Sequence, residues 1–411
     1  MTKVFSGFRT FKYLDFVACW FWKGAQYIAF TQAEMGLVAT SSICQGVQVS
    51  MLWPPILEKG LSIHFAFQGF PWKNNARDNA GVHVAIIGIS NKAEMKHLYK
   101  RVGSDWRKTA VKNISPYLLE GTNTVVPGLT NPLVGSSRVV YGSKPVDGGN
   151  FILSTDEKNA LSEENPSSSL WIRPLLGAEE FMNGKERWCL WLADASESDI
   201  NDMPKVKERI EKVRVFRSES KKADTRRISD TPHLFGQNRQ PRQSDYILIP
   251  RVTSERREYA PIGFFTNDVI VTDLVNIVPN GTLYDFGVLS TRIHMDWLHL
   301  VGGRLKSDFR YSAKLVYNTF PWPDCTLKQR TEIEALADEV LLAREDTFDW
   351  TMAEMYDPDK MPKALRKAHG NLDEAVEQLY RRTPFRDQAE RQEFLLARYE
   401  KLIKQEAGVS T

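Results

Sequence analysis

A short polar loop between two apolar runs carries the residues of this chain that are best suited to chemistry. The apolar runs end near Phe67 and resume at Val82, and between them stand Phe70, Trp72 and the polar set Lys73, Asn74, Asn75 and Arg77. Aromatic rings beside amides and cations can hold a nucleobase taken out of its stack, because the rings stack on the base while the polar groups reach its edge and its phosphate. The same pattern also fits a β-hairpin whose turn covers its own core, so the residues alone leave both interpretations open.

The elements that flank this loop predict an α/β unit. Residues 36–40 form a short apolar strand, 41–46 form a polar turn, and the apolar helical run that follows ends at Gly60. Further strands are expected at 61–67 and 82–90. A right-handed crossover joins the first two strands in parallel and the last strand can only return antiparallel, so this end of the sheet is predicted to be mixed.

Length and composition indicate a multidomain globular protein without metal chemistry. The 411 residues are 42% hydrophobic and 26% charged, which supports two or three domains with their own cores. The apolar segment 11–33 is interrupted by Lys12, Asp15 and Lys23, so we expect a buried amphipathic helix there, not a membrane span or a signal peptide. The histidines form no metal-binding motif and the four cysteines form no CxxC pair, so we expect no metal, and buried reduced thiols in a cytoplasmic protein.

Positive charge is concentrated in one part of the chain. Residues 205–257 contain 15 Lys and Arg against 7 Asp and Glu, although the formal net charge of the whole chain is only +3. Such a local excess favours contact with nucleic-acid phosphates, and a solvated basic loop is the alternative. Guanidinium groups suit phosphates and guanine edges alike, so the candidate DNA contacts outside the aromatic loop are Arg187, Arg251, Arg256 and Arg257.

Five separated blocks of the sequence resemble one protein family. The first block, 40–88, contains Gln45-Gly46-x-Gln48, Leu52-Trp53-Pro54 and the aromatic loop, and the others are 143–154, 172–192, 310–323 and 361–380. All five resemble the C-terminal part of the type IIG, or MmeI-like, restriction-modification DNA methyltransferases, which are class I S-adenosylmethionine enzymes.

This resemblance implies an organisation in three parts. Residues 1–92 would be the C-terminal half of the methyltransferase catalytic domain, 93–325 a DNA target-recognition domain and 326–411 a helical C-terminal module. The expected fold class is therefore α/β, a partial class I methyltransferase sheet, followed by a β-rich α+β recognition domain and an all-α module. Short strand-like runs at 246–277 and a capped helical stripe after Thr326 agree with it.

The motifs that would carry catalysis in such a family are absent from this sequence. The family pattern has a Gly-rich cofactor turn and an Asn/Asp-Pro-Pro-aromatic tetrapeptide, whereas Pro54-Pro55 here follows Trp53 and precedes Ile56. Gly302-Gly303 lacks the spacing of a dinucleotide-binding turn. We therefore expect no catalytic residue in this chain, and we expect S-adenosylmethionine, the cofactor of the family, not to bind to this chain alone.

Two functions from different classes fit these observations. In the first, the chain is part of a site-specific adenine-N6 DNA methyltransferase, with Phe70 or Trp72 stacking on the extruded adenine; adenine and base flipping are implied by the resemblance. In the second, it is a non-enzymatic DNA-specificity module that works with a separate catalytic polypeptide. An inactive truncated remnant is a third possibility. The expected partners are double-stranded DNA and an upstream methyltransferase segment or subunit, without which one sheet edge would be exposed.

Overall fold

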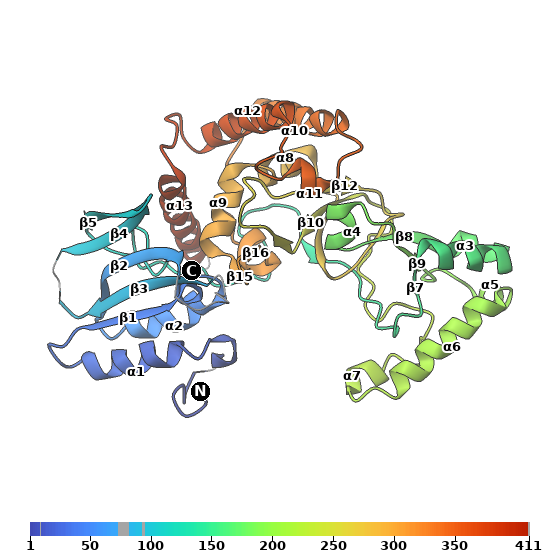
Figure 1. Cartoon of the computed structure of the whole chain (residues 1–411), viewed down its shortest axis with the longest axis horizontal. Helices are drawn as coiled ribbons and strands as arrows, with labels where there is room; N and C mark the ends of the chain where they lie inside the picture. Colours follow the sequence, from blue (N-terminus) through green and yellow to red (C-terminus); the bar gives the residue numbers. More distant parts are fainter. Residues whose placement is uncertain (9, 73–81, 93–94, 410–411) are drawn as a thin grey trace.

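The computed structural model describes residues 1–8, 10–72, 82–92 and 95–409. The chain forms an arch, with an N-terminal sheet at one end and a helical lobe of the middle region at the other (Figure 1). The C-terminal helices α10 (Leu327–Glu345) and α12 (Lys363–Tyr380) lie across the top of the arch. The partial α/β sheet, the β-rich region and the helical module predicted from the sequence are all present.

The N-terminal sheet has five strands in the order β1-β3-β2-β4-β5. Their bounds are β1 Met35–Thr40, β2 Ser62–Pro71, β3 His83–Ser90, β4 Lys96–Val102 and β5 Asp105–Val111. The sheet is mixed, as predicted, because β2 pairs in parallel with β4 and antiparallel with β3.

The predicted direct pairing of the first two strands is wrong. β1 and β2 run parallel, but β3 lies between them and pairs antiparallel with both. Almost every side chain of β3 is buried, including Ala85, Ile87 and Ile89. A strand that is apolar on both faces is most stable in the centre of a sheet, so β3 takes that position.

Two helices cover one face of this sheet. α1 (Ala18–Ile28) buries Phe21, Ala25 and Ile28, which confirms a helix within the apolar segment 11–33. α2 (Val47–Leu57) buries Trp53, whose indole N–H donates to the carbonyl of Ile43 at 2.9 Å. This bond ties the helix to the turn that precedes it.

The sheet extends past residue 92, where the sequence suggested a domain boundary. β4 and β5 form a hairpin that is paired along its whole length, from Lys96 opposite Val111 to Val102 opposite Asp105. Since β4 also pairs with β2, this hairpin belongs to the N-terminal sheet.

The middle region is built on three small sheets. The central one has the order β12-β10-β14-β6, and its strands β10 (Tyr246–Pro250) and β14 (Val275–Pro279) are buried almost throughout. The other two have the orders β13-β8-β9-β7 and β11-β16-β15. The remaining strands are β6 Val140–Tyr141, β7 Ile152–Leu153, β8 Ile172–Leu176, β9 Trp188–Leu190, β11 Val252–Thr253, β12 Gly263–Phe265, β13 Ile270–Val271, β15 Gly303–Leu305 and β16 Asp308–Arg310.

The lobe at the far end of the arch has its own core. Strands β7 to β9 pack there with α3 (Thr155–Glu164), α5 (Glu197–Asn201) and α6 (Pro204–Ser218), and the short α7 (Ala223–Arg226) follows without a buried residue. The basic segment that begins at residue 205 therefore starts with a regular helix, α6, and not with an irregular loop. The fully buried Arg217 of α6 donates five hydrogen bonds to backbone carbonyls, those of Pro145, Val146, Ile228, Thr231 and Leu234.

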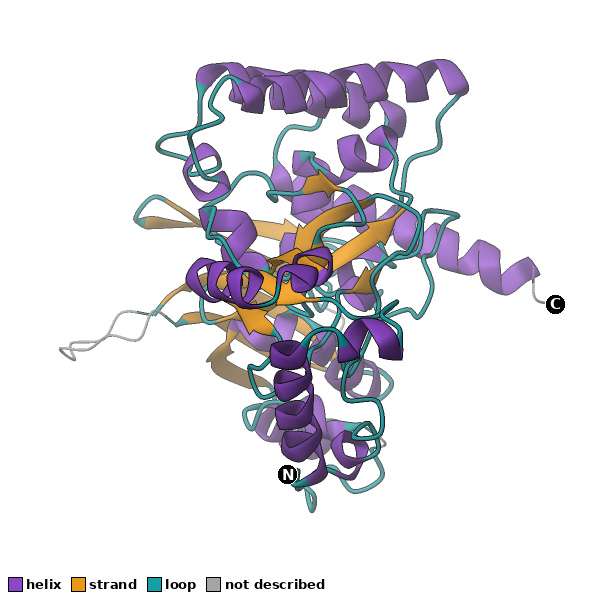
Figure 2. Cartoon of the chain, turned by 90° about the vertical axis from the view of Figure 1, so that its right-hand side faces the viewer, coloured by secondary structure: helices purple, strands orange, loops and turns teal. Residues whose placement is uncertain are grey.

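The C-terminal helices pack on the middle region. Figure 2 shows long helices along the top and the helix that leads to the C-terminus projecting to the right, with the strands running through the centre of the molecule. Phe320 and Trp322 are buried, so the segment Phe320-Pro321-Trp322-Pro323 docks by its rings. Thr326 caps α10 as predicted and accepts from the backbone of Gln329. The other helices are α4 Ala178–Asn183, α8 Leu283–Leu289, α9 Arg292–Val301, α11 Met352–Met355 and α13 Gln388–Val409.

The cysteines agree with expectation except for one. Cys19, Cys44 and Cys189 are buried free thiols, whereas Cys325 is exposed because it follows the docked Phe-Pro-Trp-Pro segment into the loop before α10.

Within the described residues, no helix is long and apolar enough to cross a membrane. The same residues contain no cluster of three or more side chains that could hold a metal ion.

Candidate nucleic-acid interface

A cleft of about 530 Å³ lies between the N-terminal sheet and the middle region. One wall follows the carboxyl end of β1 and contains Ser42, Gln45 and Gly46. The opposite wall comes from β15, β16 and the segment after them. Ligands of open α/β sheets commonly bind outside the carboxyl ends of the strands, so this cleft is a candidate ligand site.

Two glycines bring the walls into backbone contact at one point. Gly46 has φ of +64°, and a Cβ built on it would lie 3.1 Å from the Cα of Gly303. Glycine is suited to both requirements, since it tolerates positive φ and has no side chain to separate the two backbones. The Gln-Gly-x-Gln motif therefore contributes a glycine that joins the sheet to β15.

A hydrogen-bond network holds the wall on the sheet side. The carboxylate of Asp15 accepts from Ser42 Oγ and from Gln48 Nε2, each at 2.8 Å, and the backbone N–H of Asp15 donates to Gln48 Oε1 at 2.8 Å. Gln48 is buried and serves this network. The oxygen of Gln45, the other glutamine of the motif, is also buried and has no hydrogen-bond partner among the described residues.

The opposite wall is strongly basic. Arg304 pairs with Glu255 at 3.1 Å and donates to the carbonyl of Ser307 at 2.6 Å, and its burial lowers its pKa. Arg310 and Lys314 are exposed on the same wall, and neither side chain has a hydrogen bond or ion pair within the described part of the chain. These two cations are therefore free to bind anions such as DNA phosphates.

The two aromatic residues of the loop predicted from the sequence differ in exposure. Phe70 is half-buried, and its ring makes an edge contact with Trp106 of β5 at a centroid distance of 5.1 Å. Trp72 is 44% exposed, and its backbone N–H donates to Val82 at 2.8 Å. Neither ring is deep in the core, and Trp72 has the freer face. Lys73, Asn74, Asn75 and Arg77 lie outside the described residues.

The four arginines predicted to contact DNA occupy different environments. Arg251 lines the cleft and donates to the carbonyl of Asp273 at 2.6 Å. Arg187 pairs with the buried Glu180 at 2.9 Å, and Arg256 pairs with Asp359 of the C-terminal module. Arg257 is half-buried, and this burial lowers its pKa. The structure thus brings only Arg251 of the four to the cleft.

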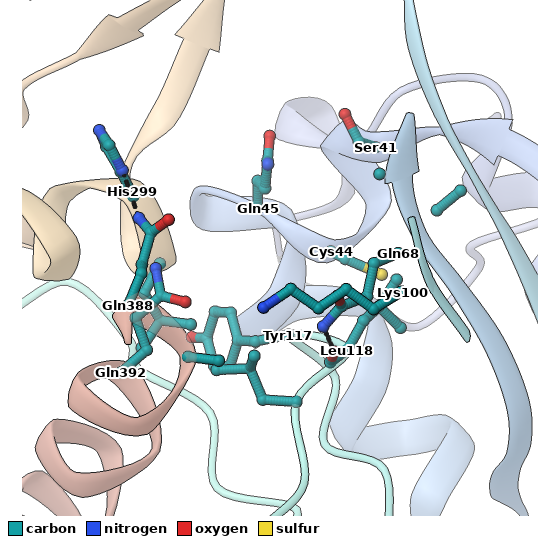
Figure 3. A pocket seen from close by; sticks show the side chains of 15 residues that line it. Ser41, Cys44, Gln45, Gln68, Lys100, Tyr117, Leu118, His299, Gln388 and Gln392 are labelled. Atoms are coloured by element: carbon teal, nitrogen blue, oxygen red, sulfur yellow. Dashed lines mark hydrogen bonds between the residues drawn. The ribbon is translucent and has the colours of Figure 1, made fainter. Parts of the chain in front are cut away.

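A smaller pocket of about 200 Å³ adjoins the cleft, and Gln45 lines both (Figure 3). Gln68 and Lys100 line it from the sheet, and His299 and Gln388 line it from α9 and the start of α13. Burial lowers the pKa of His299 to about 3, so its ring is neutral, and Gln388 Nε2 lies 2.6 Å from its Nδ1. The pocket offers amide and cationic groups, and no carboxylate lines it among the residues that the structure describes.

Sequence reasoning did not identify Arg304, Arg310 and Lys314 as site residues. The last two stand in the block 310–323 that carries part of the family resemblance, so that block was the available signal. Arg304 follows Gly302-Gly303, which looked like a plain turn. That turn starts the hairpin β15–β16 on the wall of the cleft.

Three family models match successive parts of the chain. They describe the DNA-methyltransferase domain of MmeI over residues 1–100, the MmeI target recognition domain over 120–324 and the MmeI C-terminal domain over 325–406. The chain thus contains, in this order, regions that match a DNA-methyltransferase domain, a target recognition domain and a C-terminal domain. The chain belongs to the MmeI family.

Two relatives show how much of such a protein this chain represents. It is 37% identical over 405 residues to DNA methyltransferase A of Bacillus subtilis (strain 168), covering 98% of this chain and 46% of that protein. It is also similar to the type IIL restriction-modification enzyme MmeI, solved in complex with DNA, with 40% identity and a TM-score of 0.88 over 98% of this chain and 54% of the other. The chain therefore spans about half the length of each relative.

Proposed function

We propose that this chain is the DNA-recognising part of an adenine-N6 DNA methyltransferase of a restriction-modification system. The basic cleft between the N-terminal sheet and the middle region is the observation that carries the proposal. In this cleft Arg310 and Lys314 lie opposite the carboxyl end of β1, and neither side chain has a hydrogen bond or an ion pair among the described residues. Solved MmeI is a complex with DNA, which supports double-stranded DNA as the ligand of the cleft.

Base flipping extends the proposal to the aromatic loop. Trp72 is the better stacking residue of the two, because Phe70 already contacts Trp106 whereas nearly half of Trp72 is accessible. A base stacked on an aromatic side chain gains about 1–3 kcal/mol. The other residues of this loop, Lys73, Asn74, Asn75 and Arg77, remain proposed contacts to the strand of the extruded base.

The cofactor of the family is S-adenosylmethionine, and the pocket beside the cleft does not fit it. The sulfonium and ammonium groups of this cofactor are cationic and call for carboxylates, but the described lining of the pocket has none and contains Lys100. We therefore expect this chain alone to bind the cofactor negligibly. Isothermal titration calorimetry tests this expectation, and micromolar binding would contradict it.

The salt dependence of DNA binding tests the role of the cleft. Anisotropy of a labelled duplex is measured over a series of salt concentrations for the parent chain and for Arg310→Ala with Lys314→Ala. Each phosphate contact contributes about 0.9 to the slope of log K against log salt, so the double variant is expected to lower the slope by roughly 1.8.

A matched control removes the same charge elsewhere. Lys363→Ala with Lys367→Ala changes two exposed cations of α12, at the top of the arch and away from the cleft. Its slope should equal that of the parent. Equal slopes for all three proteins would place the DNA outside the cleft and refute the proposal.

DNA binding alone does not separate a methyltransferase part from a specificity module. The two are separated by measuring methyl transfer to DNA after the chain is joined to the half of a relative that it does not match. Labelled methyl groups at adenine N6 support the proposal, and sequence-specific binding without transfer supports the module.

A further inference from the structure

The tip of the hairpin β4–β5 has a concentration of positive charge. Lys100 of β4 lies directly opposite Arg107 of β5, and both side chains are exposed. Neither has a hydrogen bond or an ion pair within the described part of the chain. Like charges directly opposite each other on neighbouring strands destabilise the pair, and such local conflicts are expected at functional sites.

The rest of the hairpin does not neutralise this pair. Its strands contain three more cations, Lys96, Arg101 and Lys108, and one acidic residue, Asp105. Among the described residues, Arg101 donates only from Nε, to the carbonyl of Gly103 at 3.1 Å, so the other nitrogens of its guanidinium remain available. The tip therefore suits an anion from outside the chain.

Strand direction places this tip at the same edge of the sheet as the cleft. β4 is parallel to β2, and β1 is parallel to β2 because both pair antiparallel with β3. The carboxyl ends of all three strands consequently lie at one edge. The cleft begins there at the end of β1, Trp72 follows β2, and the hairpin turns after Val102. Lys100 also lines the pocket that adjoins the cleft (Figure 3).

Aromatic contacts fix the hairpin to the strand that leads into the aromatic loop. Phe67 of β2 stacks on Tyr99 of β4 with 4.2 Å between the ring centroids. Trp106 of β5 makes edge contacts with Phe67 at 4.9 Å and with Phe70 at 5.1 Å. The hairpin and the start of the aromatic loop therefore hold a fixed position relative to each other.

The strand order sets the distance between the loop and the hairpin. In the order β1-β3-β2-β4-β5, the end of β2 lies between the cleft and the hairpin. Neighbouring strands are about 4.8 Å apart, so β5 lies about 10 Å beyond β2. One strand of B-DNA has a phosphate about every 3.4 Å, so this distance corresponds to about three base pairs. Figure 1 shows the hairpin at the end of the arch opposite the lobe of α6 and α7.

We propose that the tip of this hairpin binds DNA phosphates about three base pairs from the extruded base, on the side away from the recognised sequence. The ligand is the sugar-phosphate backbone of duplex DNA, which Lys and Arg contact without reading its sequence. The hairpin thereby holds the duplex beyond the methylated position, so that the DNA is bound on both sides of it. This inference rests on the proposed function, since it takes the base next to Trp72 as the methylated one.

A series of duplexes with different flanks tests this inference. Each labelled duplex contains a mispaired adenine in place of the extruded base and a long flank on one side, while the other flank is varied from one to eight base pairs. The salt slope of binding is measured by anisotropy for each duplex. For the parent chain, the slope should rise by roughly 1.8, from two phosphate contacts of about 0.9 each, once the short flank exceeds about three base pairs. Lys100→Ala with Arg107→Ala should abolish this rise.

Controls separate a lost contact from a damaged protein. Lys100→Arg with Arg107→Lys keeps both charges and should keep the rise. The alanine variant should melt no lower than the parent, because it removes a pair of like charges. The control used for the cleft, Lys363→Ala with Lys367→Ala, should behave as the parent.

The results for the hairpin and for the cleft are distinguishable. If the slope of the parent does not rise with the short flank, or if the hairpin alanine variant retains the rise, the inference is overturned. The cleft variant Arg310→Ala with Lys314→Ala should have a lower slope on every duplex but should keep the rise. If that variant retains the parental slope on every duplex, the proposed role of the cleft fails, which is a separate result.

Discussion

Replacement of the buried Arg217 by methionine should loosen the packing of α6 in the lobe at the far end of the arch. Its guanidinium donates at 2.7–3.1 Å to five carbonyls in two segments, 145–146 and 228–234, and so holds both segments against α6. A hydrogen bond to a charged group contributes about 1.5–3 kcal/mol, and burial of the guanidinium opposes the total by several kcal/mol. Arg217→Met leaves five carbonyls without this donor at about 1–3 kcal/mol for each that stays buried, and it also removes the cost of burying the charge, so we expect a net loss of a few kcal/mol.

The assay follows the lobe itself, because the whole protein has several cores. Hydrogen exchange of segment 145–241 reports the free energy of local opening, and limited proteolysis reports the same opening independently. Arg214→Met is the matched control one turn away, since Arg214 is exposed and pairs only with Glu211 at 3.1 Å. It should change the opening free energy by less than about 1 kcal/mol. An equally small effect of Arg217→Met would refute the argument that these five bonds hold the lobe together.

Three further predictions concern the loop, the cleft and the C-terminal module. Trp72→Ala should weaken binding to a duplex with a mismatched target base by about 1–3 kcal/mol and spare an ordinary duplex, while equal losses would show that the ring does not stack on the base. Gly46→Ala should destabilise the contact with Gly303 by at least about 1–2 kcal/mol, because φ of Gly46 is positive and the added Cβ would lie too close to the Gly303 backbone. An unchanged melting temperature in thermal unfolding would contradict this. Burial raises the pKa of Asp373 to about 6, so the native state binds its proton more tightly than the unfolded state and stability falls as pH rises from about 4 to 6. As the pH rises from 4 to 6, the free energy of unfolding of Asp373→Asn, measured in urea, should therefore increase by more than about 1 kcal/mol relative to that of the parent. Parallel profiles of unfolding free energy against pH for the two proteins would exclude the effect.

Local patterns predicted those parts of the fold that local interactions determine. The helix within 11–33, the strand bounds near 36–40 and 82–90 and the cap at Thr326 follow from periodicity and capping chemistry, and all are observed. The order of strands depends on long-range pairing, which those patterns do not encode. The insertion of β3 between β1 and β2 was therefore missed.

The hairpin β4–β5 shows the same limit. Five of the fourteen residues in its strands are Lys or Arg, and Leu98 and Val111 are its only buried side chains, so the sequence gives little sign of a sheet. Its place is fixed by parallel pairing with β2, about 30 residues earlier in the chain.

The basic residues of the site illustrate why chemistry alone does not define an interface. Arg187 and Arg310 have the same side chain, but Arg187 pairs with Glu180 seven residues away, whereas Arg310 has no such partner in the described structure. Whether an arginine is free depends on the fold around it. The sequence could therefore indicate that the region binds DNA without indicating which cations do so.

The backbone contact between Gly46 and Gly303 has a consequence for how such a protein measures DNA. A flexible linker between the two walls would let the methylated base drift relative to the recognised sequence. Under the proposed function, the direct backbone contact restricts this drift and would keep a fixed number of base pairs between the methylated base and the recognised sequence. Changes in the side chains of β15 and β16 could then alter which sequence is bound while the methylated position keeps its distance.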